Sequence, residues 1–164
     1  MKAIQAILVA LVATIILASV AAAGPEAAKQ RVVINLMIYP QKTFVLTPMQ
    51  AGALKGDSGK ISSNWLSIPG RKVMRDGQEV TIYDGAVTTL TGKRGTLTIR
   101  DRNEWFDLGR DGNGDGEVDG IGTTTWKVVR GTGQYAGFVG TGRGGHIGLG
   151  SPWYARYEGF LALP

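Results

Sequence analysis

Short segments of alternating apolar and polar residues, separated by glycine-rich turns, leave this chain few folds other than β. All 25 glycines come after position 23. In segment 96–100 the alternation is strict, as expected of a strand that buries one face. Segment 31–39 is apolar on most of both faces, which is typical of a strand covered on both sides. No segment after position 23 keeps a 3.6-residue period over ten positions, so the sequence predicts an all-β fold.

The expected strands are spaced closely and evenly. Turn signals such as Asp76-Gly77, Asp84-Gly85 and Pro69-Gly70 separate them. Eight to ten short strands in about 130 residues predict an antiparallel sandwich or a closed barrel. We expect one domain over 31–164, preceded by a loose tether over 24–30. The predicted strands are 31–39, 42–46, 61–65, 79–83, 86–90, 96–100, 104–108, 123–129, 134–139 and 153–161.

The first 23 residues have the pattern of an export signal. Lys2 is the only charge before Glu26, and the run 3–23 between them is almost entirely apolar. It ends in small residues followed by Gly24 and Pro25, as signal peptidase requires. We therefore expect a signal helix that is removed after Ala23. The run is also near the minimum length for spanning a bilayer, so an uncleaved anchor is the alternative. In both cases the domain would be secreted or extracytoplasmic, in a periplasm or at a cell surface.

Charge and cysteine content exclude several classes of protein. Without Lys2 the chain has 17 basic and 13 acidic residues, a net charge of +4, and no run of more than two basic residues. Such scattered charge does not predict a nucleic-acid-binding surface, and contact with a membrane is expected only through the leader. The chain has no cysteine, so packing, and a metal if one binds, must stabilise it.

Segment 111–119, Asp-Gly-Asn-Gly-Asp-Gly-Glu-Val-Asp, matches the first nine positions of an EF-hand calcium loop. Gly116 stands where that loop turns sharply. Position twelve, which should be a bidentate Glu, is Gly122, and the flanking segments read as strands. A structural calcium site of weak affinity, roughly 10⁻⁴–10⁻³ M, is one interpretation, and a polar hairpin tip is the other. The predicted ligands are Asp111, Asn113, Asp115, Glu117 and Asp119.

Other motif-like segments do not predict a catalytic site. Ser58, in Gly-Asp-Ser-Gly, resembles a protease nucleophile, but the only histidine, His146, follows it and the chain is short for that fold. Segment 140–145 fits GxGxxG without a helix after it. We therefore interpret His146 as a bystander in a glycine-rich loop. The tryptophans are expected in the core or at a rim, where some could line a cavity for an apolar ligand.

Two segments resemble a known family. Segment 126–142, with its Gly-Thr-Gly turn followed by an aromatic residue, is similar to a strand-turn-strand element of the allene oxide cyclase and dirigent-like barrels. Segment 90–99 resembles uncharacterised bacterial secreted proteins near that group. The resemblance implies an eight-stranded antiparallel, calycin-like barrel with an apolar cavity, often assembled as a homotrimer. It also implies cofactor-free, isomerase- or cyclase-like chemistry on an oxylipin or phenolic molecule. It assigns no catalytic residue to this chain.

Two functions follow as expectations. The first is an exported barrel that binds a small apolar or phenolic ligand, with a weak structural calcium loop. The second is a non-enzymatic, calcium-stabilised module that binds a cell-surface polymer or a protein. The interior of the barrel discriminates between them, because a ligand requires an open apolar pocket with a few convergent polar groups.

Overall fold

The structure is a computed structural model that describes residues 28–38, 43–48, 55–150 and 152–163, apart from positions 113, 115 and 117. The predicted leader, 1–23, and most of the predicted tether lie outside these residues. No helix within the described ranges is long and apolar enough to cross a membrane.

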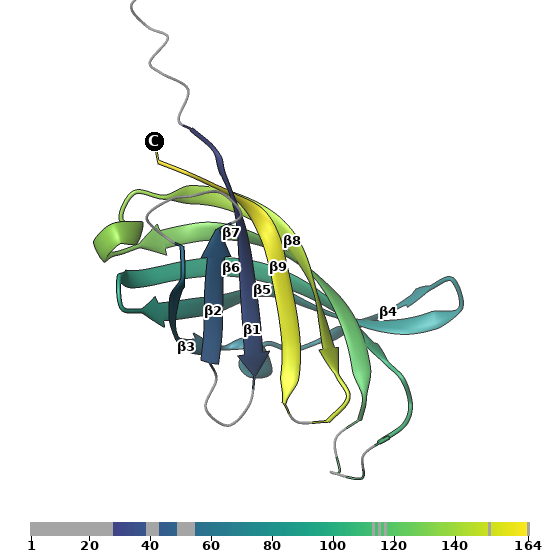
Figure 1. Cartoon of the computed structure of the whole chain (residues 1–164). Coiled ribbons are helices and arrows are strands. Elements are labelled where there is room, and N and C mark those ends of the chain that lie inside the picture. The colour runs from purple at the N-terminus through teal and green to yellow at the C-terminus, as the bar shows by residue number, and fades with distance from the viewer. Residues whose placement is uncertain are drawn as a thin grey trace, which may run out of the picture.

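Nine antiparallel strands form one sheet, in the order β3-β2-β1-β9-β8-β7-β6-β5-β4 (Figure 1). The sheet closes on itself because β3 also pairs with β5, with Ile61 opposite Leu90. Eight strands therefore make a closed barrel, and β4 lies outside the ring as a hairpin with the start of β5. The strands are β1 (Gln30–Ile38), β2 (Thr43–Pro48), β3 (Asp57–Ser63), β4 (Arg71–Arg75), β5 (Gln78–Gly92), β6 (Gly95–Asp107), β7 (Gly120–Gly131), β8 (Val139–Gly148) and β9 (Trp153–Ala162).

The prediction of an all-β, eight-stranded antiparallel barrel is confirmed, and the sandwich alternative is wrong. Two pairs of predicted strands are single strands in the structure. Segments 79–83 and 86–90 join in β5, because Gly85, at φ 85°, makes a bulge between Asp84 and Ala86 where we predicted a turn. Segments 96–100 and 104–108 join in the same way to form β6.

The strand predicted at 134–139 is wrong. Gly133–Tyr135 is a short 3-10 turn, η2, and the strand begins only at Val139. The glycine-rich segment that we interpreted as a loop is β8. Apart from His146, its inward positions are glycines, and rings from neighbouring strands lie against several of them: a Cβ at Gly142 would overlap the ring of Trp126.

The barrel interior differs between its two ends. Apolar side chains from every barrel strand except β8 form the core, including Ile34, Leu46, Leu97 and Ile99, each at most 1% exposed. At the end where β1 begins, η2 turns Tyr135 into this core. The Tyr135 hydroxyl donates a hydrogen bond to the buried Asp57 carboxylate. The opposite end is the one that remains hollow.

Candidate functional site

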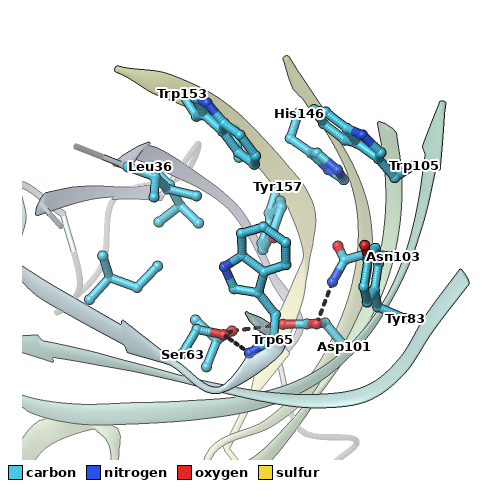
Figure 2. A pocket seen from close by; sticks show the side chains of 14 residues that line it. Leu36, Ser63, Trp65, Tyr83, Asp101, Asn103, Trp105, His146, Trp153 and Tyr157 are labelled. Carbon is cyan, nitrogen blue, oxygen red and sulfur yellow. Dashed lines mark hydrogen bonds between the residues drawn. The ribbon is translucent and has the colours of Figure 1, made fainter. Parts of the chain in front are cut away.

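A cavity of about 280 Å³ lies inside the barrel, at the end where β1 finishes and β9 starts. Its lining residues come from strands all round the barrel and from the 3-10 turn η1 (Trp65–Ser67). They are Leu36, Ile38, Ile61, Ser63, Trp65, Tyr83, Thr88, Asp101, Asn103, Trp105, His146, Trp153, Ala155 and Tyr157 (Figure 2).

Aromatic rings form a connected set around this cavity. Trp105 stacks on Trp153 with ring centroids 5.1 Å apart, and on His146 at 5.2 Å. Trp65 contacts Trp153 at 5.6 Å and meets Tyr83 edge to face at 5.8 Å. Three of the four tryptophans therefore lie at the cavity. The fourth, Trp126, is buried in the core. Aromatic walls of this kind suit flat apolar ligands.

A buried carboxylate, Asp101, lies in the cavity wall. It is 3% exposed, and it accepts hydrogen bonds from the Thr88 hydroxyl at 2.8 Å and from the Asn103 amide nitrogen at 2.7 Å. Burial raises the pKa of Asp101 above its usual 3.8, whereas these two hydrogen bonds lower it. Figure 2 shows Asp101 and Asn103 on the same part of the wall, joined by their hydrogen bond.

The hydrogen bonds continue on both sides of Asp101. On one side, Thr88 meets the Ser63 hydroxyl at 2.9 Å. On the other, the Thr124 hydroxyl donates to the Asn103 carbonyl oxygen, and Thr124 lies 3.3 Å from Nδ1 of His146. The series runs across β3, β5, β6, β7 and β8. This end of the barrel therefore contains a narrow band of hydrogen-bonded polar side chains, next to the aromatic rings that surround the cavity.

Two further ionisable groups face this band. Burial lowers the pKa of His146 from 6.5 to about 4, so the ring is neutral at pH 7. Burial also raises the pKa of Tyr157, and the nearby Asp101 charge raises it further. Perturbed groups that converge on a cavity are typical of binding and catalytic sites. At neutral pH the site thus presents neutral groups and one carboxylate.

The predicted calcium loop lies between β6 and β7, and only part of it is described: Asn113, Asp115 and Glu117 fall outside the described residues. The Asp111 carboxylate accepts hydrogen bonds from the backbone N–H of Gly114 at 2.7 Å and of Gly116 at 2.8 Å. These bonds fold the loop around Asp111.

Asp119 is the buried member of this loop, at 3% exposure. Its Oδ2 accepts the Gly112 N–H at 3.0 Å, and Nε of Arg110 lies 3.9 Å away. Its Oδ1 is buried and has no hydrogen-bond partner among the described residues. A hard cation is a suitable partner for such an oxygen. Within the described ranges, no group of three or more His, Cys, Asp or Glu side chains is placed to hold a metal ion.

The structure also places the other residues singled out from the sequence. Ser58 is exposed at the start of β3, at the opposite end of the barrel from His146, so the protease-like motif has no base. His146 lies on strand β8 and not in the loop that we expected, and its ring lines the cavity.

Sequence reasoning missed the polar band around Asp101. A signal existed on β6: the alternation that turns Leu97 and Ile99 inward also turns Asp101 and Asn103 inward when it is extended. We ended that strand at position 100, so the inward carboxylate was not recognised. On β5 the same alternation turns Thr88 inward, because it lies two residues before the inward Leu90.

No protein family model, curated protein or solved structure matches this chain. The fold and the geometry of the cavity therefore carry the functional argument.

Proposed function

We propose that this protein binds a small apolar or phenolic molecule inside the open end of its barrel. The observation that supports the proposal is the 280 Å³ cavity, in which aromatic rings surround a small set of convergent polar groups. This combination is the usual composition of small-molecule sites, because apolar walls supply affinity and a few polar groups fix the orientation. The resemblance to the allene oxide cyclase and dirigent-like barrels favours the same class of ligand.

The size of the cavity limits the ligand. At about 30 Å³ for each water in the liquid, 280 Å³ corresponds to roughly nine waters. One or two fused rings with a short substituent fit this space. A ligand of this size is expected to bind with a Kd of roughly 10 µM to 1 mM. Any reaction at the site would be a cofactor-free isomerisation or cyclisation, steered by confinement.

The test is to fill the cavity without disturbing the fold. Ala155 is buried in the wall, and Ala155→Phe places a phenyl group in the space that a ligand needs. The matched control is Tyr154→Phe at the neighbouring position, where the side chain points outward and is 52% exposed. Calorimetric titration with 2-naphthol should show binding to the wild-type protein and to the control, and at least tenfold weaker binding to Ala155→Phe. No binding to the wild-type protein, or equal binding to all three, refutes the proposal.

The second candidate function is that of a non-enzymatic module stabilised by calcium. The observation that favours it is the buried Oδ1 of Asp119, which has no hydrogen-bond partner among the described residues. Asp111 and Asp119, with positions 113, 115 and 117, would hold the ion and tie the β6–β7 loop shut. Such a module, exported by its leader, would bind a cell-surface polymer or a protein. At a Kd of about 1 mM, 10 mM calcium stabilises the fold by about 1.4 kcal/mol. Thermal melting with chelator and with calcium tests this, and an equal rise in Tm for wild type and Asp119→Asn argues against it.

A further inference from the structure

Six side chains on five strands form one hydrogen-bonded series, and Asp101 determines its direction. A carboxylate only accepts, so the Thr88 hydroxyl and the Asn103 amide nitrogen both donate to it. The Thr88 hydroxyl also lies 2.9 Å from the Ser63 hydroxyl, which extends the series to β3.

The same reasoning runs from Asn103 to His146. With its nitrogen turned toward Asp101, Asn103 presents its oxygen to Thr124, which donates to it. The Thr124 hydroxyl has one proton, and it donates that proton to Asn103. In its contact with Nδ1 of His146 it must therefore accept, so Nδ1 carries the hydrogen. A neutral histidine holds one ring proton, and therefore Nε2 is left as a lone pair.

The surroundings of Nε2 leave that lone pair available. No described residue forms a hydrogen bond with it, although the His146 ring lines the cavity. Gly122, directly across on β7, has no side chain at this place, and a Cβ there would overlap Nε2. Trp105 stacks on the ring, with only 5° between the two planes, and holds its orientation. Nε2 is thus a positioned acceptor whose own partner is not supplied by the described chain.

We propose that the cavity selects ligands that carry a hydroxyl donor, such as a phenol, and that the hydroxyl donates to Nε2 of His146 while the ring lies against the tryptophans. This inference rests on the proposed function of the cavity, and it specifies the chemistry of the ligand. In it, Thr124, Asn103 and Asp101 are positioning residues, since they act on the ligand through the His146 ring. A site built around one hydrogen bond rejects analogues that cannot make it.

The first test needs no ligand. His146 is the only histidine in the sequence, so ¹⁵N NMR of a tag-free protein gives one pair of ring-nitrogen signals, without assignment. At pH 7 we expect Nδ1 to be of the protonated type and Nε2 of the unprotonated type. Thr124→Val removes the acceptor of the Nδ1 proton and should shift the ring toward the opposite tautomer. A wild-type ring protonated at Nε2 overturns the inference, whatever the cavity binds.

The second test compares 2-naphthol with 2-methoxynaphthalene, whose oxygen cannot donate, by ligand-observed NMR competition. The wild-type protein should bind 2-naphthol about tenfold more tightly, a difference of the size expected for one hydrogen bond. His146→Phe keeps a ring against Trp105 but removes Nε2, so it should bind both compounds equally. Equal binding of both by the wild type, or a preference that survives in His146→Phe, overturns the inference and leaves the ligand-binding function standing. Binding of neither compound overturns the ligand-binding function itself.

Discussion

The lowered pKa of His146 makes the stability of the barrel depend on pH in a defined window. In the unfolded chain the ring titrates near 6.5, whereas in the folded barrel burial lowers its pKa to about 4. Between these values the unfolded state binds a proton that the folded state does not. Stability is therefore complete above pH 6.5 and is lost progressively as the pH falls toward 4. The difference of about 2.5 pH units corresponds to about 3 kcal/mol at 1.36 kcal/mol per unit.

The matched variant is His146→Asn, because the Asn amide nitrogen can replace Nδ1 as the donor to Thr124 without titrating. It loses the stacking on Trp105 at every pH, so its overall stability is lower. The informative quantity is the difference between wild type and variant at each pH. The raised pKa of Asp101 has the opposite effect on stability, because the folded state holds the carboxyl proton more tightly than the unfolded state does. Asp101 is present in both proteins, so its contribution cancels in the difference.

Urea unfolding followed by tryptophan fluorescence at pH 7.5, 6.5, 5.5 and 4.5 measures this difference. We expect the advantage of wild type over His146→Asn to be constant between pH 7.5 and 6.5. Below that it should shrink by roughly 1 kcal/mol per pH unit. An advantage that stays constant down to pH 4.5 refutes the reasoning, because it would mean that the ring is as free to take up a proton in the folded barrel as in the unfolded chain.

Three further outcomes are expected. Tyr135→Phe removes a donor from the buried Asp57 carboxylate and should lower the free energy of unfolding by about 1–3 kcal/mol in urea titration, whereas Tyr154→Phe on the outer surface should change it by less than about 0.5 kcal/mol. Gly142→Ala inserts a methyl group into the Trp126 ring and should cost at least about 3 kcal/mol, with Gly145→Ala, whose nearest contact is 3.5 Å, as the mild control on the same strand. The predicted export signal at 1–23 is tested by mass spectrometry of the protein from each fraction of an expressing bacterium: a chain outside the cytoplasm that begins at Gly24 is the expected result, and a membrane-bound chain that keeps Met1 supports the anchor alternative.

Local patterns on the strands predicted the class of fold because they report which face is buried. Segments 31–39 and 153–161 were placed to within one residue of β1 and β9, since their alternation is read directly from the sequence. The barrel itself depends on the pairing of β3 with β5, which joins residues about thirty positions apart. No local pattern encodes that pairing, and before it was seen, a sandwich and a barrel were equally consistent with the segments.

The candidate site was less predictable because polar residues mark it on strands that otherwise read as core. Asp101 stands at an inward position where alternation predicts an apolar side chain, so it looks like the end of a strand, and Thr88 lies inside the predicted strand 86–90 without any sign that it belongs to a site. Only the closed barrel shows that they face each other and bond at 2.8 Å. The predicted calcium loop had the opposite character: its spacing is explicit in the sequence, but it joins β6 to β7 and contributes no residue to the lining of the cavity.

The glycines of β8 explain why that strand was missed and why the cavity has room. Glycine weakens a strand and carries no apolar signal, so the sequence of β8 reads as a loop. In the barrel the same absence of side chains lets large rings from the neighbouring strands lie against the wall: Trp126 over Gly142 in the core, and Trp153 over Gly148 at the mouth, where a Cβ would come within 2.9 Å of the ring. Rings of that size pointing at the barrel axis would fill the open end. Because they lie along the wall instead, the interior keeps both an aromatic surface and an empty centre, and a binding cavity requires the two together.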